Sequence, residues 1–483
     1  MKRYRILFIS LLGILAPLIA TAQSLEELYK DAEFFYFRED YEESAYLFRQ
    51  LSKVEPDNYN VHFMLGMSYL YIPGEEEKAI PCFLKAVENI NLKHKANRYS
   101  EKKAPHHAWY YLGDAYAVTN QLDLALDAYE SFRSLKNFEK KYNVRIAEDR
   151  IKAVERAKII QDAPLDLKLN CLPEPINTTK SDYSAVISAN EKMMVWVSSQ
   201  RFYEAILMSV KDYDEWSEPI NITPQVMSDG DLFPTGLSWD GTELLLVKRG
   251  TLDSDIYYSK FDGTLWSKAV PVKGYINSNF VEDHASFSPD GNRIYFSSAR
   301  RGSYGGLDIY YSDRMPDGNW DIPVNLGNLI NTPYDETSAY VSPDGNTLIF
   351  SSKGHFNMGG YDLFSSILTQ SGTWTSPTNI GFPINTTKDN LHFVPLKDGK
   401  TGLYTQFTND CVGKEDLWFV EIIPYEKALL ESLQYKLSLK NFTINISDDE
   451  GETIILDYDN VADSISVRSA SGKHYRVTYS RDE

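Results

Sequence analysis

The sequence predicts a multidomain protein with an α-helical array, an all-β propeller and a small β-rich tail. Two observations carry this prediction. A spacing of aromatic and small residues recurs three times in the first third of the chain, and a Ser-Pro-Asp-Gly phrase recurs at intervals of about 50 residues after it. Repeats of the first kind are typical of helical arrays, and repeats of the second kind are typical of propeller blades.

Composition excludes several classes of protein. The chain has 483 residues, of which 43% are hydrophobic and 24% charged, so it is globular and long enough for several domains. Its net charge of −19 disfavours nucleic acid as a partner, because the phosphate backbone would repel the chain. With 3 cysteines and 8 histidines, a scaffold built on zinc or disulfides is excluded, and we expect no cofactor.

The first 22 residues have the pattern of a secretion signal. Lys2, Arg3 and Arg5 are followed by an apolar run and by the cleavage pattern Ala20-Thr21-Ala22. The alternative is a retained N-terminal anchor, although the apolar run is short for a membrane span. No cysteine follows the run, so a lipid anchor is not expected. The sequence therefore predicts export to the periplasm or the outer membrane, without a transmembrane segment.

Residues 24–162 are predicted to form a helical domain of paired helices. Its clearest unit follows the tetratricopeptide pattern, in which large, small and aromatic residues recur at fixed spacing. That unit contains Trp109, Leu112, Gly113, Tyr116, Ala125 and Tyr129. A second unit contains Leu65, Gly66, Tyr69, Ala79 and Phe83, and a looser first unit contains Ala32, Phe35, Ser44 and Phe48. The alternative is an ordinary amphipathic bundle, which three aligned copies disfavour.

A basic insertion, residues 91–105, separates the second unit from the third. We interpret it as a solvated loop or helix extension, because runs of charge usually face solvent. His106 and His107 follow it. Adjacent histidines on a helix point apart, so no shared metal is expected there.

Residues 164–423 are predicted to form the propeller. Its phrase is clearest at Ser288-Pro289-Asp290-Gly291 and Ser342-Pro343-Asp344-Gly345. Aligned copies begin at residues 188, 238, 288, 342 and 396, which gives five blades, or six if one degenerate blade escapes the pattern. Pro-Asp-Gly suits a tight turn between the two innermost strands, because proline fixes φ and glycine accepts a positive φ.

The ring is expected to close with a strand from the start of the domain. The fifth blade ends at residues 420–423 without an outer strand, whereas residues 165–169 form an extra strand. The segment after it, residues 175–179, repeats the Pro-Ile-Asn-Thr-Thr of residues 383–387. The early strand should therefore complete the last blade and remove its open edge.

The repeated phrase, with its following Phe-Ser-Ser, Gly-Gly-x-Asp and Trp-x-x-Pro elements, resembles the TolB-type (WD-like) propeller repeat. Preceded by tetratricopeptide repeats and a signal ending in Ala-Gln, it resembles envelope proteins of the Bacteroidota. This resemblance implies an association with gliding motility or type IX secretion. Many such proteins also carry an OmpA-like peptidoglycan-binding domain, which is not recognisable in residues 424–483. That tail reads as a short helix (residues 426–440) followed by four strands, and no role is predicted for it.

No catalytic motif accompanies the propeller. The sequence has no G-x-S-x-G elbow, H-E-x-x-H helix or Walker loop. The leading hypothesis is therefore a non-enzymatic scaffold that binds one or more envelope proteins. A glycan- or cell-wall-binding propeller is the alternative, and a propeller enzyme is a third, less favoured one.

Five acidic residues precede successive innermost strands and form a candidate binding rim at one mouth of the channel. They are Asp182, Asp231, Glu282, Glu336 and Asp389, with Arg300 and Arg301 in a loop on the same face. The rim could attract a cation or a basic segment of a partner. The alternative is that these acids cap turns.

The cysteines suggest one disulfide. Cys171 ends the closing strand and Cys411 precedes the strand expected to pair with it, so an oxidising compartment favours a Cys171–Cys411 bond. The alternative is two unpaired thiols. Cys82, on a helix beside Phe83, is expected to be a free core residue.

Overall fold

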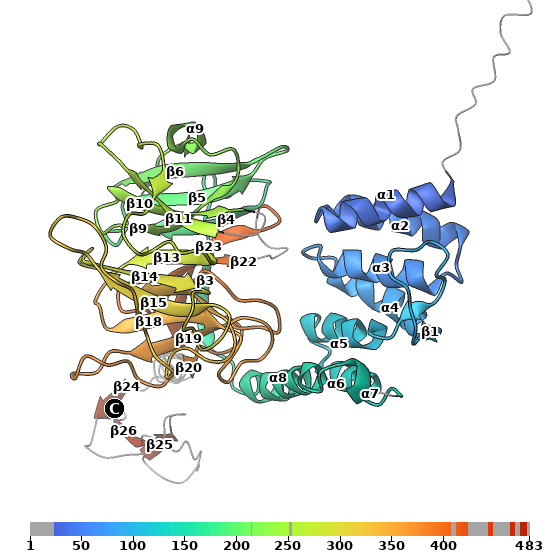
Figure 1. Ribbon diagram of the computed structural model, residues 1–483. Coiled ribbons are helices and arrows are strands. Elements are labelled where there is room, and N and C mark those ends of the chain that lie inside the picture. Colours follow the sequence, from blue (N-terminus) through green and yellow to red (C-terminus); the bar gives the residue numbers. More distant parts are fainter. Residues whose placement is uncertain are drawn as a thin grey trace, which may run out of the picture. The chain divides into compact units, whose positions relative to one another are not determined.

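The computed structural model describes residues 24–136, 138–213, 215–250, 254–406, 412–423, 443–447, 464–468 and 474–480. It divides after Ala147 into two compact units. Figure 1 shows helices in the first unit and stacked sheets in the second. The predicted secretion signal and the helix expected at residues 426–440 lie outside the described residues. Among the described residues, no helix is long and apolar enough to cross a membrane.

The first unit is an array of paired helices, as predicted. The helices are α1 (Leu25–Phe37), α2 (Tyr41–Val54), α3 (Tyr59–Leu70), α4 (Ala79–Val87), α5 (Ala108–Val118), α6 (Leu122–Arg133) and α7 (Phe138–Lys141), and α8 (Arg145–Gln161) crosses the division between the units. Helix α1 begins with a capping box, in which Ser24 and Glu27 each bond the other's backbone N–H. The basic insertion is a connection with two short strands, β1 (Ile90–Asn91) and β2 (Ala104–Pro105), that pair in parallel.

Close helix approach explains the glycines of the repeats. A Cβ on Gly113 would lie 2.5 Å from Tyr129 Cε1, and one on Gly66 would lie 2.8 Å from Phe83 Cε1. Each glycine thus lets the next helix of its pair place an aromatic ring against the backbone, which offsets the helix propensity that glycine lacks.

The second unit contains a five-bladed propeller. Blade 1 contains β4 (Asp182–Ile187), β5 (Met193–Ser199), β6 (Glu204–Asp212), β7 (Glu215–Trp216) and β8 (Ile220–Asn221), followed by the short helix α9 (Thr223–Val226). Blade 2 contains β9 (Leu232–Leu237), β10 (Glu243–Arg249), β11 (Ser254–Lys260) and β12 (Val270–Pro271). Blade 3 contains β13 (Glu282–Phe287), β14 (Arg293–Ser298), β15 (Asp308–Asp313) and β16 (Val324–Asn325). Blade 4 contains β17 (Glu336–Val341), β18 (Thr347–Ser352), β19 (Asp362–Ile367) and β20 (Thr378–Asn379).

Blade 5 closes the ring as the sequence predicts. It contains β21 (Val394–Leu396), β22 (Thr401–Gln406), β23 (Asp416–Ile423) and, as its outer strand, β3 (Asp166–Cys171). β3 pairs antiparallel with β23, from Trp418 opposite Cys171 to Ile423 opposite Asp166. The first strand after the helical array thus removes the last open edge of the blade.

The propeller core lies between neighbouring blades. Alternate side chains of one sheet pack on those of the next, so that Val195 of blade 1 and Leu246 of blade 2 share one cluster with Trp266. The last blade packs in the same way, and Leu167 of β3 joins its cluster.

In the tail, β24 (Thr443–Ser447), β25 (Ser464–Arg468) and β26 (His474–Ser480) form a three-stranded antiparallel sheet in the order β24-β26-β25. The fourth strand expected there, at residues 453–456, lies outside the described residues.

Candidate functional site

The propeller has two faces, which strand direction distinguishes. Each innermost strand begins at one face, and the Pro-Asp-Gly turns lie at the other. The loops before the innermost strands and the loops between second and third strands share the first face. We call it the loop face, and it carries the predicted rim.

Three of the five predicted rim acids do not lie on the surface. Asp182, Glu282 and Glu336 begin β4, β13 and β17, and each is fully buried. Both Glu336 carboxylate oxygens accept hydrogen bonds from Thr332, from its backbone N at 2.8 Å and its Oγ1 at 2.6 Å. Ser352 Oγ donates a further one at 2.6 Å. The prediction of an exposed negative rim is therefore wrong at these three positions, and the alternative of turn capping is what the structure shows, because burial of a carboxylate requires these donors.

Asp231 and Asp389 lie one residue before the position that the buried acids occupy in the other blades, and they make different contacts. Asp389 Oδ1 accepts a hydrogen bond at 2.8 Å from the backbone N of Tyr361, in the preceding blade. Asp335 Oδ1 holds the N–H of Leu307 in the same way, at 3.1 Å. In blade 2, Asp231 forms an ion pair with Lys248 at 3.1 Å. In blade 5, Asn390 occupies the buried position and accepts a hydrogen bond from the backbone N of Thr386 at 2.8 Å.

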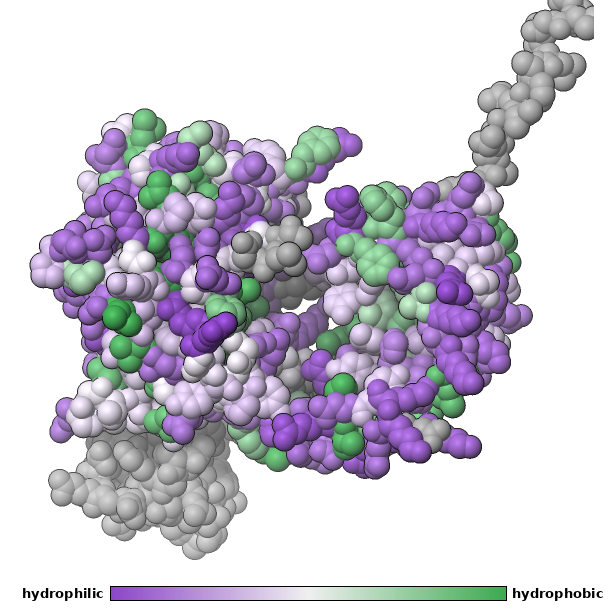
Figure 2. All heavy atoms as spheres, in the orientation of Figure 1, coloured by the Kyte–Doolittle hydropathy of each residue, from purple (hydrophilic) through white to green (hydrophobic). Residues whose placement is uncertain are grey.

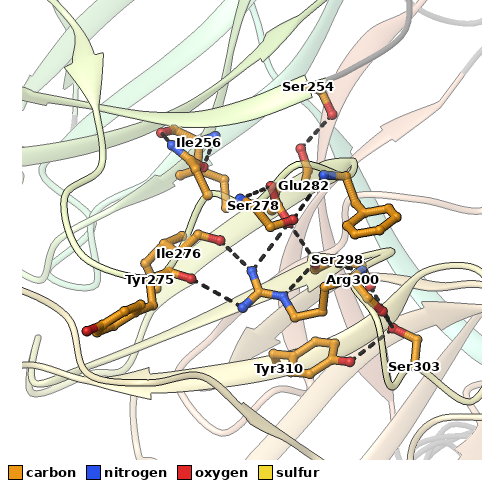
Figure 3. A network of polar contacts seen from close by, with 12 residues as sticks. Ser254, Ile256, Tyr275, Ile276, Ser278, Glu282, Ser298, Arg300, Ser303 and Tyr310 are labelled. Atoms are coloured by element: carbon orange, nitrogen blue, oxygen red, sulfur yellow. Dashed lines mark hydrogen bonds and ion pairs between the residues drawn. The ribbon is translucent and has the colours of Figure 1, made fainter.

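Arg300 is a structural residue rather than a rim cation (Figure 3). Its guanidinium contacts Glu282 Oε1 at 3.3 Å, donates to Ser298 Oγ at 2.8 Å and to the carbonyl of Tyr275 at 3.2 Å, and also binds the carbonyl of Ile276. Arg300 therefore joins the loop before β13 to the loop after β14, and it gives buried Glu282 a cation. Arg301, its neighbour, is exposed.

The Gly-rich loops after β14 and β18 owe their glycines to packing. A Cβ on Gly305 would lie 1.8 Å from the carbonyl oxygen of Tyr334, and one on Gly359 would lie 2.4 Å from that of Thr387. These loops are pressed against the next blade, which leaves no room for a side chain.

Tyr340, a residue of β17, reaches across the channel. Its hydroxyl donates to the carbonyl of Thr235 at 3.0 Å, which joins blade 4 to blade 2. The mouth of the channel at the turn face is lined mostly by apolar and proline residues, among them Val186, Pro289 and Val394.

Two histidines lie close together near Tyr340. The rings of His284 and His392 have centroids 5.9 Å apart, and His284 packs edge-on against Tyr340 at 4.8 Å. His284 is fully buried, and neither of its ring nitrogens has a hydrogen-bond partner. Burial lowers the pKa of His392 to about 4 and that of His284 well below its usual range, so both imidazoles are neutral at pH 7.

Strand bulges occur in three of the innermost strands, one of them at His284. The pairing of β13 with β14 shifts between Glu282 and Ala285, and the same shift recurs in β4 and β17. Ser184, Ser338 and His392 have φ of 49°, 52° and 58°, an unusual conformation for residues with a Cβ. Bulges re-aim side chains beside functional sites, and here they occur where the innermost strands face the channel. Sequence reasoning missed both histidines because they come from different blades, before β21 and in β13, and meet only in the folded ring.

Exposed aromatic and methionine side chains are the other feature of the loop face that sequence reasoning missed. Those of blades 1 to 3 and of the connections between these blades form what we call the loop-face patch. The patch consists of Phe202, Tyr203, Met227, Tyr275, Phe280 and Tyr304, exposed by between 40% and 87%. Gly230, close to Met227, lies against Tyr203, and Arg300 binds the Tyr275 carbonyl, so neighbouring loops of the patch touch one another. Figure 2 shows apolar side chains scattered among polar ones on the visible side of the propeller.

The remaining sequence predictions concern metals and cysteines. In the described parts of the chain, no group of three or more His, Cys, Asp or Glu side chains is arranged to hold a metal ion. His106 is buried and packs on Tyr142. Cys171 is disulfide-bonded and Cys82 is free, whereas Cys411 lies outside the described residues, so the Cys171–Cys411 pairing stays a prediction.

Comparison with known proteins identifies no family. No protein-family model and no curated protein matches the sequence. Among solved structures, TolB from Agrobacterium tumefaciens is 18% identical, with 50% of this chain and 74% of that chain covered at a TM-score of 0.32. TolB from Acinetobacter baumannii is 16% identical over 50% of this chain and 55% of that one, at a TM-score of 0.30. An α-L-arabinofuranosidase from Podospora anserina is 12% identical over 52% of this chain and 93% of that one, at 0.34. Likenesses this distant concern the propeller architecture and say nothing of function.

Proposed function

We propose that this protein is a non-enzymatic binding scaffold of the cell envelope, which holds a protein partner on the loop face of its propeller. The loop-face patch is the observation that carries the proposal. Protein interfaces are enriched in aromatic residues and methionine, and loops on a rigid scaffold commonly carry binding. The buried acids Asp182, Glu282 and Glu336 at this face accept hydrogen bonds from the loops that precede their strands.

The helical array offers a second surface. Tyr41 and Tyr71 stack with centroids 5.0 Å apart, and Tyr36 lies 5.6 Å from Tyr41. Tyr71 is 46% exposed and Phe37 is 62% exposed, so this tyrosine cluster reaches solvent. Helical repeat arrays bind peptides through such surfaces. We therefore propose a bridge between two partners, in the periplasm or at the outer membrane, and the resemblance to Bacteroidota envelope proteins favours the type IX secretion or outer-membrane assembly machinery.

The patch is tested by co-purification from envelope extracts in mild detergent. A triple variant with Phe202→Ser, Tyr203→Ser and Tyr304→Ser should lose the partner that the wild type retains, because aromatic anchors dominate binding energy. Tyr213→Ser is the matched control, since Tyr213 is 95% exposed but follows β6 at the turn face. Equal recovery with the triple variant and the wild type would remove the patch from the proposal.

The two-surface bridge has its own test. A deletion strain is complemented with the array alone, the propeller alone or the whole chain, and secretion and envelope integrity are measured. Only the whole chain should restore both. Full rescue by either half would show that one surface suffices.

A glycan is the second candidate partner, and one groove favours it. Between blades 3 and 4, at the turn face, a groove of about 500 Å³ is lined by Tyr295, Trp374, Arg293 and Asp344. Aromatic faces beside fixed polar groups suit sugar rings. Binding on a glycan array that Trp374→Ala abolishes, with no protein partner recovered, would favour this candidate over the first.

A further inference from the structure

Neither ring nitrogen of His284 has a hydrogen-bond partner, although its side chain is fully buried. A buried imidazole normally finds a partner for its N–H, because the lost hydration would otherwise cost free energy. His392, in the connection before β21, makes a ring contact with it. His392 lies 5.9 Å away, ring to ring, and its Nδ1 is 3.4 Å from Ser338 Oγ.

From this geometry we propose that His284 and His392 bind one divalent transition-metal ion in the propeller channel. Imidazole is a preferred ligand of Zn²⁺, Cu²⁺ and Ni²⁺. Two imidazoles whose ring centroids lie 5.9 Å apart can ligate one ion between them, since metal–nitrogen bonds are about 2.0–2.1 Å long. The site is separate from the proposed partner-binding patch and does not depend on it.

Charged groups lie near the two rings. Asp283 is beside His284 in the bulge, and Thr337 Oγ1 donates a hydrogen bond to its carboxylate at 3.0 Å. The Asp283 carboxylate and the Arg249 guanidinium both act electrostatically on His392, in opposite directions. Asp283 would supply negative charge near the ion while Thr337 fixes its position, as outer-shell groups do in metal sites. His284 is buried and His392 is partly exposed.

Two protein ligands make this a weaker site than a structural zinc centre. Water and the hydroxyls of the channel wall would complete the coordination.

Isothermal titration of the purified chain with ZnCl₂ tests the proposal. We expect one saturable site in the wild type. His284→Gln and His392→Gln should each weaken it by more than about tenfold, because losing one of two ligands costs at least as much as losing an outer-shell partner. His62→Gln, in α3 of the helical array, is the control and should bind like the wild type.

A second measurement does not depend on the variants folding. Cu²⁺ added to the wild type in equimolar amount should give an electron paramagnetic resonance spectrum with hyperfine splitting from two nitrogens. No saturable Zn²⁺ binding, a copper spectrum without coupled nitrogens, or binding that both Gln variants retain would each overturn the proposal.

Discussion

Arg300 and Gly354 occupy equivalent positions in blades 3 and 4. Because of this difference, the buried acids Glu282 and Glu336 have different surroundings. Each lies two residues after the serine, Ser298 or Ser352, that donates to the acid. Glu282 has the Arg300 guanidinium beside it. Glu336 has hydroxyl and amide donors instead, and burial raises its pKa to about 7.

Arg300→Met should lower the free energy of unfolding by about 3–5 kcal/mol, because it leaves the Glu282 charge buried without its cation. The two carbonyls that Arg300 binds would also lose their donors. Chemical denaturation followed by tryptophan fluorescence measures the change. Arg301→Met is the matched control and should change stability by less than about 0.5 kcal/mol, because Arg301 is exposed. Similar losses for both variants would contradict the role assigned to Arg300.

The buried carboxyl of Glu336 should make the stability of the protein depend on pH. Its folded pKa of about 7 lies above the ordinary value of 4.5, so the folded state holds a proton that the unfolded state releases. The stability this group contributes is fully present below pH 4.5 and is lost as pH rises through 7. Asp362, whose pKa burial also raises to about 7, acts in the same direction.

Glu336→Gln should therefore remove about 1–3 kcal/mol of pH-dependent loss of stability between pH 5 and pH 8. Urea unfolding at a series of pH values measures the slope. Glu218→Gln, which changes an exposed carboxylate, should keep the slope of the wild type. A Glu336→Gln slope equal to that of the wild type would mean that Glu336 does not carry this proton.

At the scale of elements, the helix pairs depend on glycine at the crossing. Gly113→Ala should destabilise the array by about 1–3 kcal/mol despite the better helix propensity of alanine, because the new Cβ overpacks the site. The clash would be with the ring of Tyr129, 2.5 Å away. Thermal unfolding followed by circular dichroism measures the loss, and Tyr129→Leu in the same chain should recover part of it. Unchanged or increased stability of Gly113→Ala alone would show that the helices can separate at no cost.

The sequence allows the blades to be predicted more fully than the site. Pro-Asp-Gly turns are local, so each copy marks the boundary between two strands, and the missing outer strand of blade 5 follows by counting. The rim prediction is wrong because adjacent acids such as Asp335 and Glu336 have different roles, and the residue pattern does not tell which of them is buried. Burial follows the strand register, in which Glu336 pairs with Ser352. The channel histidines were missed because they meet only across blades.

At the scale of the whole molecule, the propeller is closed by one antiparallel strand pair between distant parts of the sequence. β3 and β23 are joined by six residue pairs in register, from Cys171 to Asp166 on one side. Leu167 and Cys171 pack into the core of the last blade, so closure buries apolar surface as well as an edge. Opening of the ring would expose both, and this pair is therefore where we expect global unfolding to begin.

A covalent bond at this closure should stabilise the whole propeller. If Cys171 pairs with Cys411, the bond closes a loop of most of the propeller, and the chain-entropy model gives about 4–5 kcal/mol for loops of this size. Cys171→Ser should lower the unfolding temperature measured by tryptophan fluorescence, and a reductant should lower that of the wild type but not of the variant. Cys82→Ala is the control, because Cys82 is free and burial raises its pKa to about 12, which keeps it unreactive. Peptide mapping without reductant should find Cys171 joined to Cys411, and full alkylation of Cys171 in the native protein would refute the covalent closure.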